Sequence, residues 1–158
     1  MKKLSLAALL LAAAMAAPGH AEVVRPAPAI ACVAGKSLQS FKGQPVIVLV
    51  APSARSGAFR KQARRIQAVY QQFAARNAVF IAVFTEPDER PVPSNVPFIL
   101  AADGPKTAAD YGFNGKFNLY VIGRDRNLDL ATAKVVPASR LMDAIYNNAE
   151  QQASERKM

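Results

Sequence analysis

Two uninterrupted runs of β-branched and other apolar residues constrain the fold of this chain most strongly. They are residues 45–51 (PVIVLVA) and residues 79–84 (VFIAVF). Runs without polar alternation are typical of central strands that are covered on both faces of a sheet. Between them, over residues 54–76, apolar side chains recur at steps of three and four, which predicts one long amphipathic helix. A strand, a helix and a strand in this order predict a parallel crossover unit and therefore an α/β protein.

The remainder of the chain predicts a series of shorter elements. Four prolines lie between residues 85 and 97, so we expect that segment to be a loop. A polar turn at residues 123–127 (GRDRN) separates two apolar runs and predicts an antiparallel hairpin. The elements predicted after the loop are a strand at 98–101, a short helix at 105–111, hairpin strands at 117–122 and 128–132, and a last helix at 137–151.

Residues 1–21 have the parts of a secretory signal peptide: a basic start, an apolar run, and small residues before the expected cleavage point at Ala21. The apolar run is shorter than the roughly 20 residues that a membrane-spanning helix needs. We therefore expect a periplasmic or secreted protein without a transmembrane segment. Lipoprotein cleavage at Cys32 is the less favoured alternative, since charged residues and prolines separate Cys32 from the apolar run. The predicted mature chain comprises a flexible or irregular segment at 22–36, one folded domain at 37–151 and a disordered tail at 152–158.

The predicted mature chain contains one cysteine, Cys32, and no histidine, because the single histidine of the sequence, His20, lies in the predicted signal peptide, the leader. This count excludes a Ser-His-Asp triad, a Cys-His dyad and a zinc site built from histidine and cysteine. We expect neither a metal nor a cofactor. One cysteine cannot form a disulfide within the chain, so Cys32 is buried, free, or bonded to a second copy. Burial is favoured, because free cysteine is among the most buried residue types.

The order of the predicted elements resembles that of the thioredoxin-like superfamily, and two stretches make the resemblance specific. Residues 45–57 (PVIVLVAPSARSG) are similar to the segment of secreted thioredoxin-like and peroxiredoxin-like proteins in which a strand leads to a CxxC motif at a helix start. Residues 110–122 (DYGFNGKFNLYVI) are similar to the stretch that carries a cis-proline before the hairpin in that family. The resemblance implies a three-layer α/β sandwich, with a mixed sheet of about five strands and helices on both faces.

The resemblance also implies an active-site corner, and this chain departs from the family there. The two cysteine positions fall on Ala54 and Gly57. The aromatic residue that precedes them is Ser53 here, and the cis-proline is replaced by Phe117. The family's nucleophile is a thiolate at the helix start, which neither Ala54 nor Gly57 can supply. A cis bond before a residue other than proline costs about 2.5–4 kcal/mol, so we predict a trans bond before Phe117. The resemblance thus implies a member that lacks disulfide exchange.

The predicted long helix is unusually basic. Residues 51–84 contain six basic residues and no acidic one, in a chain of formal net charge +9. Arg60 with Arg64, and Lys61 with Arg65, are like-charge pairs four residues apart, each costing about 0.2–0.5 kcal/mol. The pattern indicates either a solvated polar face or a surface that binds anions. The candidate residues of such a surface are Ser53, Arg55, Ser56, Arg60, Lys61, Arg64 and Arg65.

These observations favour a binding or assembly module for an anionic surface or a protein partner that the sequence does not identify. One alternative is a thiol-dependent antioxidant or oxidoreductase that uses Cys32, although no helix dipole is predicted to lower the pKa of that thiol. The other is a small-ligand carrier. Nucleic acid is not expected as a partner, since the protein is predicted to be secreted and aromatic residues do not alternate with basic ones on the helix. A dimer linked through Cys32 is left open.

Overall fold

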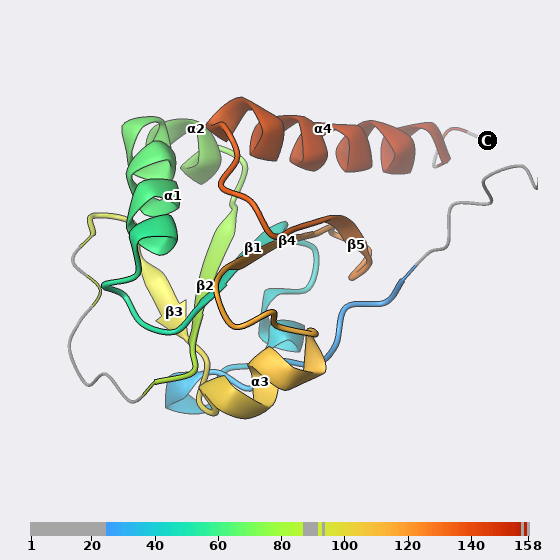
Figure 1. The fold of residues 1–158 in the computed structure, drawn as a ribbon. Coiled ribbons are helices and arrows are strands. Elements are labelled where there is room, and N and C mark those ends of the chain that lie inside the picture. Colours follow the sequence, from blue (N-terminus) through green and yellow to red (C-terminus); the bar gives the residue numbers. More distant parts are fainter. Residues whose placement is uncertain (1–24, 87–91, 93, 156, 158) are drawn as a thin grey trace, which may run out of the picture.

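The computed structural model describes residues 25–86, 92, 94–155 and 157, so the predicted leader lies outside the described residues. The centre of the structure is a five-stranded sheet with the order β3-β2-β1-β4-β5 (Figure 1). Its strands are β1 Val46–Ala51, β2 Val79–Phe84, β3 Phe98–Leu100, β4 Asn118–Ile122 and β5 Leu128–Thr132. The pairs β1–β2 and β2–β3 are parallel, whereas β1–β4 and β4–β5 are antiparallel. The predicted mixed sheet and the predicted hairpin are both confirmed.

Strand β1 is buried along its whole length because a layer of structure covers each face of the sheet. The covering elements are the helices α1 Gly57–Ala68, α2 Tyr70–Ala74, α3 Gly104–Asp110 and α4 Ala138–Glu155, and the 3₁₀ turns η1 Val33–Gly35 and η2 Leu38–Phe41. Every second side chain of β1, beginning with Ile47, packs into a first core under α1, α2 and α4. The others, beginning with Val46, pack into a second core with α3 and η2. Figure 1 shows these two layers on opposite sides of the strands, which confirms the predicted three-layer sandwich.

The first core is rich in aromatic side chains, and one buried amide lies beside it. The rings of Phe73 and Phe80 meet edge to face, with their centroids 5.5 Å apart. Gln62 of α1 is fully buried, and its carboxamide donates to the carbonyl of Val136 at 3.1 Å and accepts from the amide of Val136 at 2.9 Å. Both ends of this amide are therefore satisfied, and they join α1 to the connection between β5 and α4.

The prediction of one long helix over residues 54–76 is wrong in two respects. First, residues 53–56 form a turn, and α1 begins only at Gly57. Second, α1 ends at a break at Val69, whose backbone angles (φ −129°, ψ 25°) are not helical. The amide of Val69 donates to the carbonyl of Ile66, three residues back, and α2 then begins at Tyr70. A β-branched residue loses side-chain freedom in a helix, which makes Val69 a suitable place for the break.

The elements after the proline-rich loop agree with prediction, except at the C-terminal end. Asp103 caps α3 by accepting a 3.0 Å hydrogen bond from the amide of Lys106, and Pro105 lies in the first turn, as the sequence indicates. Helix α4 extends to Glu155, four residues beyond the predicted end at Gln151. The first part of the predicted disordered tail is therefore helical, because residues 151–155 contain no proline or glycine to stop a helix. No helix among the described residues is long and apolar enough to cross a bilayer.

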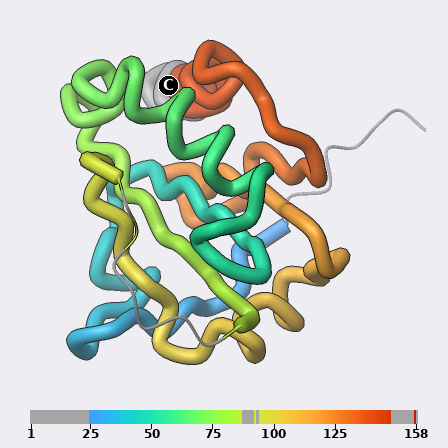
Figure 2. Tube along the Cα trace, turned by 60° about the vertical axis from the view of Figure 1, so that its left-hand side comes forward, coloured from blue at the N-terminus to red at the C-terminus, as the bar shows by residue number. Residues whose placement is uncertain are grey.

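The segment before β1 has little regular structure, as expected, but it packs closely on the sheet. Ile30 and Cys32 are 1% and 4% exposed and belong to the second core. The amide of Ala102 donates to the carbonyl of Ala31 at 2.8 Å, and the hydroxyl of Tyr111 donates to the carbonyl of Pro28 at 2.7 Å. Figure 2 shows this segment, in blue, at the same end of the molecule as α3. The predicted boundary between residues 36 and 37 thus separates two stretches that share one core.

The buried phenol of Tyr111, in the second core, predicts a loss of stability at alkaline pH. Burial, with a smaller contribution from Tyr120, raises the pKa of Tyr111 above its ordinary value of 10.0. The folded protein therefore holds the phenolic proton more tightly than the unfolded chain does. That contribution to stability is complete below the unfolded pKa of about 10 and disappears as the pH rises above it. We expect the urea midpoint, measured by circular dichroism in a Cys32→Ser background, to fall from about pH 10 upward.

The variant Tyr111→Phe is the control for this effect. It lacks the bond to Pro28, so its stability at neutral pH should be lower by about 1 kcal/mol. It also lacks the phenolic proton, so its further loss above about pH 10 should be smaller than that of the parent protein. Parallel pH curves for the two proteins would contradict the assignment to Tyr111.

Candidate functional site

The positions at which the resemblance implies a catalytic motif lie in the turn between β1 and α1. Ala54 is 5% exposed and packs in the first core, while Gly57 is the first residue of α1. The amide of Ser53 donates to the hydroxyl oxygen of Ser56 at 3.3 Å, and the amide of Arg55 donates to the hydroxyl oxygen of Ser53 at 3.2 Å. Both hydroxyl groups thus stabilise the turn itself. Ser56 occupies the N-cap position of α1, but its side chain makes no capping hydrogen bond to the helix.

Phe117 is the residue that the sequence resemblance aligns with the family's cis-proline. Its side chain is 2% exposed and belongs to the same core as Ala54 and Phe59. The side-chain oxygen of Asn114 accepts from the amide of Phe117 at 3.2 Å and so fixes the backbone just before β4. The peptide bonds of the described residues are all trans, which confirms the prediction for Phe117. Phe117 and Ala54, the residues that the resemblance aligns with the family's proline and first cysteine, therefore lie in one apolar core.

A small pocket of about 160 Å³ opens beside this corner. Buried apolar side chains from the turn and α1 contribute one part of its lining: Ala54, Phe59 and Ala63. The exposed side chains of Arg60 and Arg64 contribute another, together with Gln67 of α1. Residues Val92 and Ser94 of the proline-rich loop complete the lining. The pocket thus combines two arginine side chains with an apolar surface, an arrangement suited to an anionic group carried on an apolar stem.

The structure gathers only some of the predicted anion-binding residues at this pocket. Arg60 and Arg64 line it, whereas Arg55, Lys61 and Arg65 do not. An i, i+4 pair lies on one side of a helix, and the Arg60–Arg64 pair is the one turned toward Ala54. Sequence reasoning missed Gln67, Val92 and Ser94. Gln67 follows Arg64 by three residues and could have been found from helical spacing, but nothing in the sequence indicates that the loop returns to this helix.

Cys32 lies away from this pocket, in the core on the other face of the sheet. It belongs to the cluster of Ile30 and Leu38, whereas Ala54 belongs to the cluster under α1. Burial raises the pKa of the Cys32 thiol above its ordinary value of 9.0, and nearby Lys36 lowers it by a smaller amount. Of the three alternatives for this residue, the structure favours burial. A disulfide to a second copy would require the side chain of Cys32, which is 4% exposed, to leave the second core.

This placement predicts slow thiol chemistry. We expect Cys32 in the native protein to react with Ellman's reagent at pH 8 at least about 100-fold more slowly than in the urea-unfolded chain, because reaction requires local opening. Absorbance of the released thiolate measures both rates. Equal rates would show that the thiol is accessible in the native state.

The described residues also bear on metal binding. Among residues 25–86, 92, 94–155 and 157, no three histidine, cysteine, aspartate or glutamate side chains come together at one place. The polar side chains in the lining of the pocket are the guanidinium groups of Arg60 and Arg64, the amide of Gln67 and the hydroxyl of Ser94.

Comparison with known proteins supports the fold assignment. The solved structure of a protein named as the thiol:disulfide interchange protein DsbE from Chlorobium tepidum has a TM-score of 0.62 and 20% sequence identity, over 79% of this chain and 96% of that one. The peroxidoxin BcpB from Mycobacterium tuberculosis has a TM-score of 0.61 and 17% identity, over 77% of this chain and 94% of that one. A thiol:disulfide interchange protein from a Bacteroides species has a TM-score of 0.57 and 20% identity, over 81% of this chain and 88% of that one. At these identities the likeness establishes the fold alone.

No curated protein matches the sequence. A family model does match, and it covers residues 26–130, which extend from the segment before η1 into β5. That range contains β1 to β4, the first three residues of β5, the β1–α1 turn and the pocket. On the fold and on this match, the chain is a member of the thioredoxin-like superfamily and belongs to the AhpC/TSA family.

Proposed function

We propose that this protein binds an anionic group of a partner at the pocket beside Ala54, and that it does so without thiol chemistry. One observation carries the proposal: Ala54, the residue that the resemblance aligns with the nucleophilic cysteine, lines one pocket with Arg60 and Arg64. The single cysteine of the chain lies in the other core. The site retains the positive charge that an anion needs and lacks the sulfur that disulfide exchange needs.

The charge pattern of α1 supports this proposal. Residues 51–84 carry no carboxylate, so no acidic side chain of α1 or its flanking strands neutralises Arg60 and Arg64. The mutual repulsion of a like-charge pair four residues apart is relieved when an anion binds between them. Guanidinium groups also offer paired donors that match the two oxygens of a carboxylate or phosphate.

The experiment compares two charge reversals on the same helix. The variant Arg60→Glu/Arg64→Glu changes the pocket, whereas Lys61→Glu/Arg65→Glu changes the net charge equally outside it. Binding of fluorescein-labelled hexaglutamate, followed by anisotropy at low salt, should be at least about tenfold weaker for the pocket variant than for the control variant. Circular dichroism should be unchanged in both. Equal losses would mean that the chain attracts anions through its net charge and that the pocket is not a site.

A second candidate function, thiol-dependent reduction through Cys32, is favoured by the family match. Its test is insulin reduction and peroxide consumption by the mature protein and by Cys32→Ser. Activity that disappears in the variant would replace the first proposal by this one. The small-ligand carrier is the remaining alternative. A thermal-shift screen would support it if neutral small molecules raised the melting temperature more than anions did.

We also propose export to the periplasm or the exterior, with removal of residues 1–21. The support is the order of basic, apolar and small residues in that segment. Mass spectrometry of the protein from a fractionated cell should find a mature chain that begins at Glu22 in the exported fraction. An intact N-terminus in the cytosol would exclude this proposal.

A further inference from the structure

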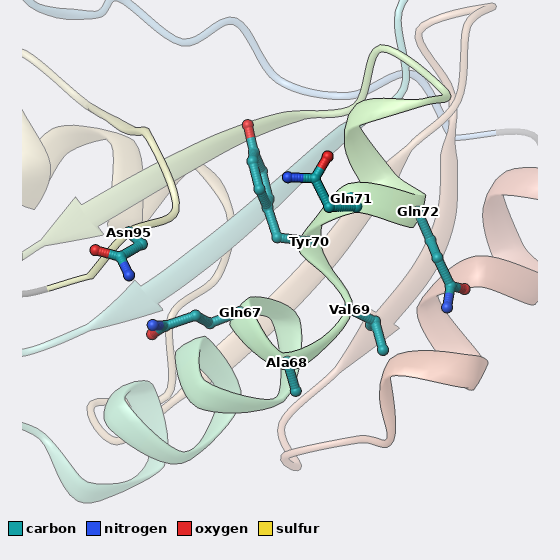
Figure 3. A pocket seen from close by; sticks show the side chains of 7 residues that line it. All are labelled: Gln67, Ala68, Val69, Tyr70, Gln71, Gln72 and Asn95. Atoms are coloured by element: carbon teal, nitrogen blue, oxygen red, sulfur yellow. The ribbon is translucent and has the colours of Figure 1, made fainter.

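A second cavity, of about 410 Å³, lies next to the pocket and shares Gln67 with it. It is lined by residues around the break between α1 and α2 and by one residue of the proline-rich loop: Gln67, Ala68, Val69, Tyr70, Gln71, Gln72 and Asn95 (Figure 3). Because Gln67 lines both spaces, the pocket and the cavity are neighbours on the surface beside α1. We call the two together the α1 groove.

The two ends of the α1 groove differ in chemistry. Arg60 and Arg64 supply positive charge at the end near Ala54. The other end has carboxamides and a phenol in its lining and no ionisable acid or base other than that phenol. Figure 3 shows the amide of Gln67 extending from α1 toward that of Asn95, and the amide of Gln71 beside the ring of Tyr70. A carboxamide offers one acceptor and two donors, which match the N–H and C=O groups of a peptide backbone.

The groove is elongated along the helix axis. Arg60, Arg64 and Gln67 follow one another at steps of four and three residues, so they lie along one face of α1. Seven residue steps at a rise of 1.5 Å place Gln67 about 10 Å along α1 from Arg60, and Gln71 of α2 lines the cavity beyond it. An extended peptide covers 10 Å with about three residues, and about five residues reach from Arg60 into the cavity around the break.

Tyr70 helps to distinguish a peptide from a sugar as the ligand. Carbohydrates usually need an exposed aromatic face on which to stack. The ring of Tyr70 packs instead against Phe80, at a centroid distance of 6.1 Å, and is only partly exposed. The exposed polar groups at this end are amides, which suit a peptide backbone.

We propose that the α1 groove binds an extended peptide of about five residues, with a carboxylate at Arg60 and Arg64 and its backbone along Gln67, Gln71 and Asn95. The carboxylate belongs to an acidic side chain or to the C-terminus of the peptide. The placement of the carboxylate rests on the proposed function. The recognition of the backbone rests on the amides alone.

The experiment uses a pool of fluorescein-labelled pentapeptides with four randomised positions and a C-terminal aspartate. Wild-type protein captures binders from the pool, and anisotropy then measures the affinity of the enriched peptides. For Gln67→Ala/Asn95→Ala we expect affinity to fall by at least about fivefold, because the backbone loses its partners. The exposed variant Gln39→Ala, on η2, is the control and should bind as wild type does. Circular dichroism should be unchanged in each case.

The outcomes separate this inference from the proposed function. If the enriched peptides bind Gln67→Ala/Asn95→Ala as tightly as wild type, or if the pool yields no binders, the peptide groove is overturned. Hexaglutamate binding that still depends on Arg60 and Arg64 would then leave the proposed function intact. Peptide affinity that depends on the amides but not on the arginines would overturn the arginine site and support the rest of the groove. Tighter binding of trigalacturonate than of any peptide, with the same dependence on the amides, would replace the peptide by an acidic glycan.

Discussion

Replacing Gly104 by alanine is expected to prevent stable folding. A Cβ atom at Gly104 would overlap the carbonyl oxygen of Phe84 and lie 2.8 Å from its carbonyl carbon. Phe84 ends β2, and Gly104 begins α3, which packs on β2. Both contacts are with backbone atoms, so no side-chain rotation can relieve them. The helix must move off the strand, and we expect a destabilisation of more than about 4 kcal/mol.

Urea denaturation followed by far-ultraviolet circular dichroism measures this effect, and Gly57→Ala is the matched control. Gly57 also begins a helix, yet a Cβ there meets nothing within 4 Å. Alanine at that position should be neutral or stabilise by up to about 1 kcal/mol, because it restricts the unfolded chain. Similar midpoints for Gly104→Ala and Gly57→Ala would show that α3 does not pack on β2 as described.

The second large effect is expected at Arg126, in the turn between β4 and β5. One nitrogen of its guanidinium, Nη2, donates to the carbonyls of Phe41 and Gln44, the first of these at 2.8 Å. Hydrogen bonds from a charged donor each contribute about 1.5–3 kcal/mol. Part of that gain is offset by desolvation, which also lowers the pKa of Arg126, since Nε and Nη1 are buried without a partner among the described residues. We expect Arg126→Ala to lower the free energy of unfolding by about 2 kcal/mol.

Two further variants make this prediction specific. Arg126 has a φ of +69°, a conformation that glycine adopts freely and alanine does not. Arg126→Gly should therefore be less destabilised than Arg126→Ala by about 1 kcal/mol. Arg124→Ala, in the same turn, should be close to wild type in urea denaturation. If the alanine variants at 124 and 126 have equal midpoints, the guanidinium of Arg126 does not join the hairpin to the segment before β1.

The polar connections in the structure have a common character. Gln62 joins α1 to Val136, and Arg126 joins the hairpin to the segment before β1. Each is a long polar side chain that reaches backbone groups far away in the sequence. Neither residue stood out in the sequence, because one glutamine or arginine among many carries no sign of the backbone that it meets.

The candidate site, too, could be predicted only in part from the sequence. Helical spacing predicts that Arg60 and Arg64 share a face, and the resemblance places Ala54 at the helix start. That Val92 and Ser94 line the same pocket depends on where the tertiary structure places these two residues. The break at Val69, which shapes the amide end of the α1 groove, was missed because apolar periodicity continues across it through Tyr70 and Phe73.

What the sequence by itself determined is the layered sheet. The apolar side chains of residues 45–51 and 79–84 can be buried only when both faces of the strands are covered. The amphipathic segment between the two runs covers one of these faces. It also determined that Ala54 and Gly57 cannot exchange disulfides, because that conclusion needs only the identity of the residues. Tertiary structure alone decided which core holds Cys32, which arginines face Ala54, and where Gly104 meets Phe84. These features depend on contacts between residues distant in the chain, and neither periodicity nor composition encodes which of the many possible contacts is made.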